Sequence, residues 1–347
     1  MVSTSTSCSW SPVTDYGSLS VVLPTRYQGP LLEYVELATR CEGWGYDGVW
    51  ATEVAGADAF VLATACGLAT QRMTVGTGAV AVGSRSPAMI ALSAATASSL
   101  VPGRFILGLG TSTPAIVSGW HGQPFEAPLR RLEATVDVVR AVLAGRESSG
   151  NSPLAPGSGF RVEIDPLPAP APIYTAALRA ASLRLAGRHA DGAILTLTDP
   201  AHVEWQLSQI LGAETVAGST QAVVYVRCCV TTDPEGAHSW MRRELAWYST
   251  SSAYREHFAS MGHEQAMHDI AEVWGRDRSI EGVADLVPQP LIDDLMLAGS
   301  AEVVSARLAE FWDAGANDVA IYPISADGTC RAADLEATLS SVAKALR

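Results

Sequence analysis

Short apolar runs alternate with longer amphipathic segments from residue 19 to the end of the chain. The runs are almost continuously hydrophobic, as in parallel strands covered on both faces, and the longer segments have a helical period. The predicted strands are 19–23, 46–50, 73–82, 105–109, 172–175, 193–197, 222–231 and 318–322. The predicted helices are 29–42, 57–69, 87–100, 128–143, 180–188, 200–211, 234–248, 301–314 and 331–346. This alternation predicts an α/β fold with a parallel sheet.

Eight strand–helix units leave two arrangements open, a doubly wound open sheet and a closed barrel. We favour the (β/α)8 TIM barrel, because eight units with inserted loops fit it better. Two segments interrupt the alternation and are interpreted as insertions: 146–170, rich in Gly, Ser and Pro, and 249–298, helical but irregular. Residues 1–18 are interpreted as an N-terminal arm, and 19–347 as a single domain because no linker-like segment divides them.

Composition and charge exclude several classes of function. The formal net charge of −13 argues against a nucleic-acid-binding surface or an anionic-membrane surface. Lys344 is the only lysine and lies in the amphipathic terminal helix, so a Schiff-base lysine is not expected. The six cysteines are scattered without a CxxC pair, which indicates free thiols and no metal site. With no secretory signal and no membrane-spanning run, we expect a cytoplasmic protein.

In a parallel barrel the active site lies at the C-terminal ends of the strands. The residues at these ends are mostly small and hydroxylic, without a carboxylate cluster or a Ser–His–Asp set. A barrel end lined by such residues is suited to bind a large organic cofactor, which would supply the reactive group in place of the protein side chains. One strand ends in Gly108-Leu109-Gly110, where glycine lets a ligand approach the backbone. The dinucleotide fingerprint needs another glycine at position 113, which is Thr, so a Rossmann site is not expected.

Several sequence blocks, in the right order, resemble the luciferase-like monooxygenase superfamily, particularly its branch that uses the deazaflavin coenzyme F420. The blocks are Gly45-Tyr46-Asp47-Gly48-Val49-Trp50 with Glu53, Val75-Gly76-Thr77-Gly78 with Arg85-Ser86-Pro87, Gly103-Arg104-Phe105-Ile106-Leu107-Gly108-Leu109-Gly110 with Pro124-Phe125 and Arg131, Pro172-Ile173-Tyr174 with Ala190-Asp191-Gly192, and Ala314-Gly315-Ala316 with Asp318. The likeness covers about residues 19–325. It implies a TIM barrel with coenzyme F420, or alternatively FMN, across the strand ends.

The resemblance also implies where the cofactor lies. A non-proline cis peptide beneath the cofactor ring would fall at Gly78-Ala79. The cofactor phosphate would meet backbone amides where the helix after the fifth strand begins, and Arg179 either adds a charge-assisted bond there or is a solvated surface arginine. The residues expected to bind the cofactor are Thr25, Gly78, Ala79, Thr111, Ser112, Leu178, Arg179, Ala180 and Ala181.

The chain departs from the family pattern at the residues that handle protons. Glu53 matches the family's acidic residue, but Val54 stands where many members have His, and Thr113 replaces an acidic residue that sometimes follows the fourth strand. Sugar-phosphate oxidation through a histidine base is therefore not expected. Glu53 and His121 are the candidate catalytic residues. The alternatives are a structural carboxylate and a surface-loop histidine.

Three aromatic residues, Trp50, Trp120 and Tyr322, are candidates for stacking on an aromatic substrate, or else pack in the core or at the rim. His257, His263 and His268 fall in the 249–298 insertion, where their spacing does not suit a metal. An insertion in such a barrel more often forms a lid over the substrate.

Three functions remain open on these residues. The first is an F420-dependent oxidoreductase, in which reduced coenzyme F420 passes a hydride to a C=C or C=N bond of a small organic substrate. The second is an FMN-dependent monooxygenase supplied by a separate reductase. The third, suggested by the missing histidine, is a non-catalytic luciferase-like subunit. We expect a small-molecule substrate, a homodimer, and neither nucleic acid nor a membrane as partner.

Overall fold

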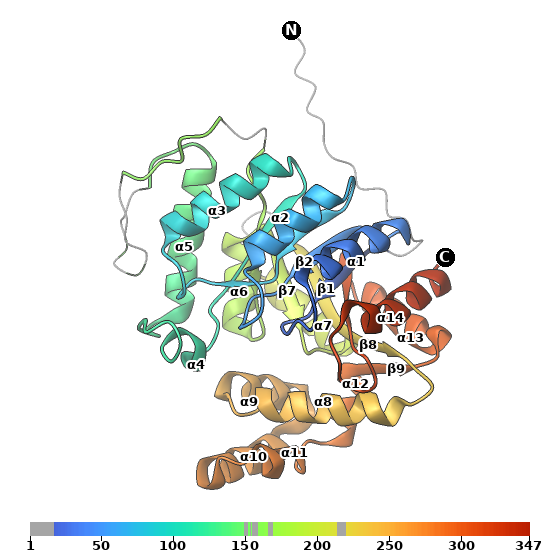
Figure 1. Ribbon diagram of the computed structural model, residues 1–347. Coiled ribbons are helices and arrows are strands. Elements are labelled where there is room, and N and C mark those ends of the chain that lie inside the picture. Colours follow the sequence, from blue (N-terminus) through green and yellow to red (C-terminus); the bar gives the residue numbers. More distant parts are fainter. Residues whose placement is uncertain (1–16, 149–151, 153, 155–158, 166–168, 214–219) are drawn as a thin grey trace.

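The computed structural model describes residues 17–347 except 149–151, 153, 155–158, 166–168 and 214–219. Within these residues eight parallel strands close into a barrel surrounded by helices, which confirms the predicted fold class (Figure 1). The barrel closes because β10 pairs with both β1 and β8. Its strands are β1 (Ser18–Leu23), β2 (Gly48–Ala51), β3 (Thr74–Thr77), β5 (Phe105–Gly110), β6 (Ile173–Ala176), β7 (Gly192–Thr196), β8 (Gln221–Val230) and β10 (Asp318–Pro323).

Helices cover the outside of the barrel, and several begin where the sequence places a proline or a capping side chain. Pro87, Pro128, Pro200 and Pro234 each take the first helical position, where the missing N–H costs no hydrogen bond. The helices beside the strands are α1 (Leu31–Gly43), α2 (Ala59–Ala69), α3 (Pro87–Leu100), α5 (Pro128–Leu143), α6 (Ala180–His189), α7 (Pro200–Leu211), α8 (Pro234–Tyr248), α13 (Ala301–Asp313) and α14 (Ala332–Ala345), with the short α4 (Pro114–Val117) after β5.

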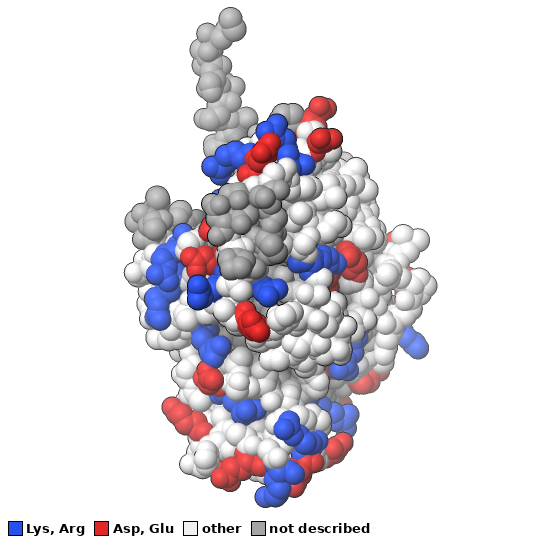
Figure 2. All heavy atoms as spheres, turned by 90° about the vertical axis from the view of Figure 1, so that its left-hand side faces the viewer, with Lys and Arg blue, Asp and Glu red and all other residues white. Residues whose placement is uncertain are grey.

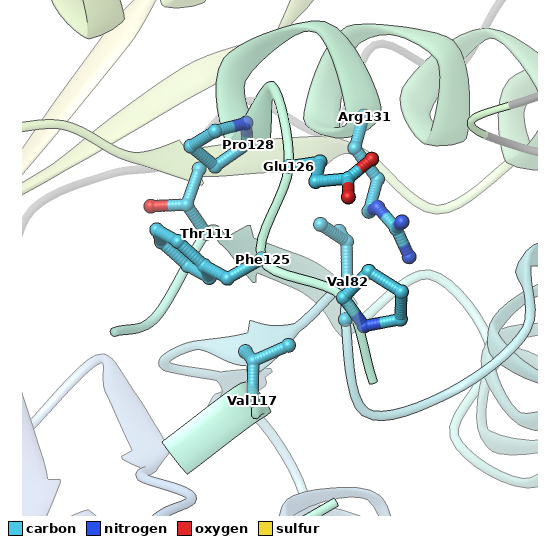
Figure 3. Close-up of a pocket in the computed structure, with 9 residues that line it drawn as sticks. Val82, Thr111, Val117, Phe125, Glu126, Pro128 and Arg131 are labelled. Atoms are coloured by element: carbon cyan, nitrogen blue, oxygen red, sulfur yellow. The ribbon is translucent and has the colours of Figure 1, made fainter. Parts of the chain in front are cut away.

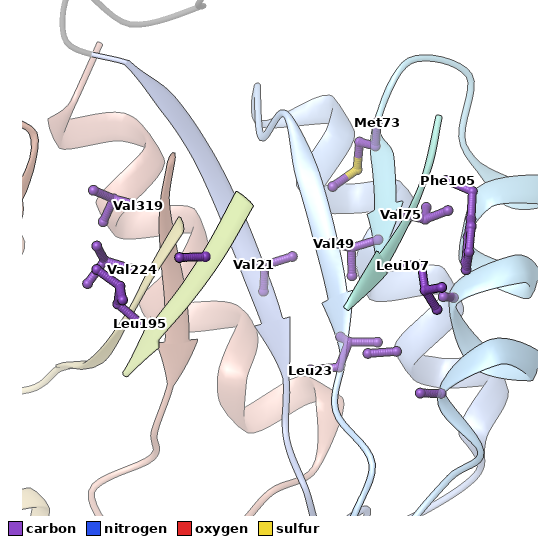
Figure 4. Close-up of a cluster of buried hydrophobic side chains, with 14 of the residues drawn as sticks. Val21, Leu23, Val49, Met73, Val75, Phe105, Leu107, Leu195, Val224 and Val319 are labelled. Carbon is purple, nitrogen blue, oxygen red and sulfur yellow. The ribbon is translucent and has the colours of Figure 1, made fainter. Parts of the chain in front are cut away.

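The hydrophobic core has two layers. The outer layer lies between the strands and the helices, where Val21, Val49 and Leu107 are completely or almost completely buried (Figure 4). The inner layer fills the barrel and contains Trp50. Strand β3 has glycine beside this ring, since a Cβ at Gly76 would lie 2.5 Å from it. Trp50 is 2 % exposed and therefore packs in the barrel interior.

Two regions differ from the predicted elements. The run 73–82, predicted as one strand, is divided into β3 and the short β4 (Val80–Ala81) by a cis peptide bond at Gly78–Ala79. The segment 249–298 ends in a strand that the pattern did not predict, β9 (Met296–Gly299), which pairs with β8. It was missed because its apolar run follows a helix directly, without a Gly or Pro boundary.

The rest of the 249–298 segment is helical, as predicted. It consists of α9 (Ser252–Phe258), a π-helical turn η1 (Ala259–His263), α10 (Glu264–Asp277), α11 (Ile280–Ala284) and α12 (Gln289–Leu295). These helices and α8 lie together in the lower part of Figure 1 and share a second hydrophobic cluster. Phe258 and Leu291 are completely buried there.

The predicted domain boundaries remain predictions. Ser18 already belongs to β1, while residues 1–16 of the predicted arm, and parts of the 146–170 insertion, lie outside the described residues. None of the described helices is long and apolar enough to cross a membrane. Acidic and basic side chains are interspersed over the face shown in Figure 2. In the described part of the chain no group of His, Cys, Asp and Glu is placed to hold a metal ion.

Candidate active site

A cavity of about 280 Å³ lies at the C-terminal ends of the barrel strands. It is lined by residues from all eight barrel strands or the loops after them, and by helices that include α8 and α9. Eight of the nine predicted cofactor residues line it, namely Thr25, Gly78, Ala79, Thr111, Ser112, Leu178, Arg179 and Ala181. Ala180, the ninth, is the first residue of α6 and is not among the lining residues.

The floor of this cavity is formed by small residues. Gly78 and Ala79 contribute the cis peptide bond that the family resemblance implied. Gly110 lies beside them, since a Cβ on it would be 3.4 Å from Ala176 and 3.6 Å from Ala79. The absence of large side chains leaves a floor against which a planar ring can lie.

Tyr225 approaches this floor from the barrel interior. Its hydroxyl lies where a side chain on Gly78 would be, 2.1 Å from an ideal Cβ. The hydroxyl is buried and makes no hydrogen bond within the described residues. Burial raises the pKa of Tyr225 well above its ordinary value, so the phenol stays protonated at neutral pH. Tyr225 is therefore a hydrogen-bond donor at the cavity floor.

The loop between β6 and α6 forms another wall and presents the start of a helix. The Ser182 hydroxyl accepts hydrogen bonds from the amides of Leu178 and Arg179, both at 3.2 Å, and donates one to the Arg179 carbonyl at 2.9 Å. The amides of Ala180 and Ala181 belong to the first turn and have no acceptor within the helix. This helix start offers N–H groups of the kind that bind phosphate.

Arg179 is engaged by a carboxylate from the 249–298 segment. Its guanidinium forms an ion pair with Glu256 of α9, and both side chains are about half exposed. The ion pair ties α9 to the loop at the start of α6. Because Arg179 also lines the cavity, it is neither a free cation nor an isolated surface side chain.

Glu53 lines the cavity as predicted, but it is held in a network. Both of its carboxylate oxygens accept hydrogen bonds from Arg85, and Oε2 accepts one from the Ala59 amide at 3.1 Å. Arg85 also pairs with Asp58, the N-cap of α2, at 2.6 Å. The arrangement fixes the wall between β2 and α2 and is typical of a structural carboxylate.

The other predicted catalytic and substrate residues are not brought together. His121 and Trp120 are exposed in the turn after α4 and do not line the cavity. Trp50 packs below the floor, because its side chain points into the barrel. Tyr322 does line the cavity, and its hydroxyl accepts a hydrogen bond from the Thr25 amide at 3.1 Å.

The segment after β5 closes a second, much smaller cavity of about 10 Å³ behind Thr111 (Figure 3). Phe125, Val117, Glu126 and Arg131 are among the residues that line it. This volume holds about one water molecule, so it is too small for a substrate.

Sequence reasoning missed several cavity residues, among them Tyr225, Arg227, Tyr248 and Tyr254. Arg227 stands in the otherwise apolar strand β8, while Tyr248 ends α8 and Tyr254 lies in α9. Arg227 could have been predicted as a site residue from the sequence, because a charged residue within a buried parallel strand needs a partner. Tyr248 and Tyr254 could not, because their place depends on how α8 and α9 pack over the barrel.

His257 secures α9 beside the cavity. Its Nε2 lies 2.7 Å from the Leu197 carbonyl, and the side chain is completely buried. The pKa of His257 is lowered to about 4, mainly by burial; His202 of α7 also lowers it, while the backbone hydrogen bonds to Leu197 and Leu178 and the charge of Asp199 raise it. His257 is thus neutral at physiological pH, with Nε2 donating to the carbonyl.

The depressed pKa predicts that this contact is lost in acid. The folded-state pKa lies below the ordinary value of 6.5, so the stabilisation is complete above about pH 6.5 and lost as the pH falls towards about 4. The unfolding free energy of the wild type falls between neutral and acidic pH. We expect this decrease to be smaller in His257→Gln, by on the order of 2–3 kcal/mol. Denaturant unfolding at pH 5 and pH 7.5 measures this, with exposed His268→Gln as the matched control. Equal pH slopes for wild type and His257→Gln contradict the prediction.

Comparison with known proteins places the chain in a family. A family model for luciferase-like monooxygenases matches residues 18–318. The "Putative coenzyme F420-dependent oxidoreductase" of Mycobacterium tuberculosis is 28% identical over 323 residues, which cover 86% of this chain and 92% of that protein. A 5,10-methylenetetrahydromethanopterin reductase of Archaeoglobus fulgidus is 26% identical over 312 residues, covering 85% and 90% of the two chains.

A solved structure shows the same fold. The coenzyme F420 dependent tetrahydromethanopterin reductase from Methanopyrus kandleri matches with a TM-score of 0.76 at 20% identity, covering 95% of this chain and 97% of that one. The family model spans most of the chain, and the barrel agrees with it. The chain therefore belongs to the luciferase-like monooxygenase family.

Proposed function

We propose that the protein is a coenzyme F420-dependent oxidoreductase. The observation that carries the proposal is the cavity itself: a floor of small residues at Gly78, Ala79 and Gly110 faces the same space as the start of α6. A planar ring and a phosphate on one molecule match these two features. Full-length relatives named for coenzyme F420 support the choice of cofactor.

The bound cofactor would supply a hydride, which we propose passes to a C=C or C=N bond of a small organic substrate. The residues of this chain then bind and orient. The floor of Gly78, Ala79 and Gly110 receives the ring, the first-turn amides of α6 receive the phosphate, and the Tyr225 hydroxyl donates a hydrogen bond at the floor. Helices α8 and α9 contribute to the cavity wall and limit the entry of water.

Glu53 stays our candidate for proton handling, because it reaches the cavity and His121 does not line it. Arg85 and the Ala59 amide hold its carboxylate in place. The substitution Glu53→Gln separates the two roles of this side chain. Loss of turnover with unchanged cofactor affinity indicates proton transfer, whereas weaker cofactor binding and a lower melting temperature indicate a structural role.

The proposal is tested by parallel titrations with coenzyme F420 and FMN, followed by fluorescence. We expect coenzyme F420 to bind with a micromolar dissociation constant and FMN at least about tenfold more weakly. Micromolar binding of FMN without binding of F420 would contradict the proposal and favour the monooxygenase. Binding of neither, with assembly into a stable hetero-oligomer, would favour a non-catalytic subunit.

A further inference from the structure

Arg227 is a buried cation in the wall of the cavity. It belongs to β8, and its side chain is 4 % exposed. Its Nη1 donates a hydrogen bond to the Thr196 hydroxyl at 3.2 Å, and Nη2 lies 3.5 Å from the Tyr248 hydroxyl. Both partners are neutral, and Nε is buried without a hydrogen-bond acceptor. Among the residues that the structure describes, no carboxylate forms an ion pair with it.

Aromatic rings surround this guanidinium. Its central carbon lies 5.1 Å from the centre of the Tyr322 ring and 5.7 Å from that of Tyr248. Tyr254 packs on Tyr248, with 4.7 Å between ring centres, and also lines the cavity. Cation–π contacts offset part of the desolvation cost of a buried arginine, but they leave its charge uncompensated.

The position of Arg227 separates it from the floor on which the cofactor ring is proposed to lie. Its neighbours Thr196 and Tyr322 lie at the C-terminal ends of β7 and β10, whereas Gly78 directly follows β3 and Gly110 ends β5. Strand β8, which carries Arg227, lies between β7 and β10 in the barrel. Arg227 therefore faces the cavity from the side opposite β3 and β5.

We propose that Arg227 binds the carboxylate of a planar, unsaturated monocarboxylic acid, and that Tyr248, Tyr254 and Tyr322 receive the apolar part of that molecule. One guanidinium carries one charge and offers parallel N–H donors that match a carboxylate. A phosphate dianion would need a second cation, and Arg179, which also lines the cavity, is paired with Glu256. The inference rests on the proposed function for the unsaturation of this acid, for its role as substrate and for the place of the cofactor ring.

The anion could also come from the cofactor, because a reduced deazaflavin ring carries negative charge on its pyrimidine part. The test therefore separates substrate from cofactor. Trans-cinnamate and the isosteric, uncharged cinnamamide are titrated into the protein without cofactor, and coenzyme F420 is titrated separately in its oxidised and reduced forms. The variants are Arg227→Gln, Arg227→Lys and the exposed control Arg276→Gln.

We expect the wild type and Arg276→Gln to bind cinnamate at least about tenfold more tightly than cinnamamide. Arg227→Gln loses this preference, and Arg227→Lys keeps part of it because the charge remains but the paired donors do not. F420 affinity changes less than threefold in either variant. Arg227→Gln also melts at the same temperature as the unliganded wild type or higher, because an uncompensated buried charge has been removed.

Four binding results overturn the inference: no binding of cinnamate at millimolar concentration, equal binding of cinnamate and cinnamamide to the wild type, a preference that Arg227→Gln retains, or an F420 affinity that falls with Arg227→Gln as much as cinnamate affinity does. A lower melting temperature for Arg227→Gln would mean that Arg227 is structural, which also overturns it. Because cinnamate is titrated without cofactor, failure of the F420 proposal leaves this result interpretable.

Discussion

Substituting Gly108 by alanine is expected to lower the free energy of unfolding by about 3 kcal/mol, or to prevent folding. An ideal Cβ at this position would lie 1.9 Å from the Thr77 carbonyl oxygen and 2.8 Å from the Ile194 side chain. The Thr77 hydroxyl bonds to both the amide and the carbonyl of Gly108, each at 2.9 Å. The backbones of β3 and β5 are therefore in close contact at Gly108, and hydrogen bonds prevent them from moving apart to admit a side chain.

Chemical denaturation of Gly108→Ala beside the wild type measures the effect. Gly110→Ala is the matched control, because its Cβ meets Ala176 and Ala79 at ordinary contact distances of 3.4 and 3.6 Å. We expect that control to change the free energy of unfolding by less than about 1 kcal/mol. A similarly small change for Gly108→Ala would show that the two strands are not held this closely.

Gly110→Leu is expected to weaken binding of coenzyme F420 at least about 100-fold, while the protein stays folded. A β-carbon fits at this position, but the rest of a leucine side chain would project between Ala79 and Ala176, both of which line the cavity. It would occupy the space in which the cofactor ring is proposed to lie. The loss comes from steric exclusion, so it affects the affinity and not the fold.

The measurement is a fluorescence titration of F420 into Gly110→Leu, Gly110→Ala and the wild type, with a melting curve for each. Gly110→Ala, which adds one methyl group, should weaken binding by less than Gly110→Leu. If Gly110→Leu binds F420 as tightly as the wild type, the ring does not lie on this floor.

The barrel was predictable because its elements obey local rules. Leu107 and its apolar neighbours form a strand buried on both faces, and Pro87 and Pro200 mark helix starts that the structure places at the same residues. Strand β9 depends instead on its pairing with β8, and the cis peptide bond at Gly78–Ala79 was expected only from the family resemblance. A local pattern carries no information about such contacts.

The cavity was predictable only in part for a similar reason. Residues on the loops after the strands were found from their order in the chain, since all parallel strands end at the same side of a barrel. The sequence does not show in which direction a side chain points. Trp50 was therefore predicted to contact the substrate, although it packs inside the barrel. The partner of Glu53, Arg85, comes from the segment that follows β4 and could not be inferred from spacing.

Arg227 is a site residue that the sequence alone could have indicated. Its charge interrupts the buried strand 222–231, and the structure places it in the cavity wall beside Tyr322. A buried cation in a parallel strand indicates either an acidic partner or an anionic ligand. The structure supplies the distinction, because the guanidinium bonds only to neutral hydroxyls among the described residues.

The most direct test of the proposed site is a crystal structure of the protein with bound coenzyme F420. We predict that the deazaflavin ring lies against Gly78, Ala79 and Gly110, with the phosphate at the amides of Ala180 and Ala181. Electron density for the cofactor outside this cavity, or a ring separated from the Gly78–Ala79 floor, would contradict it.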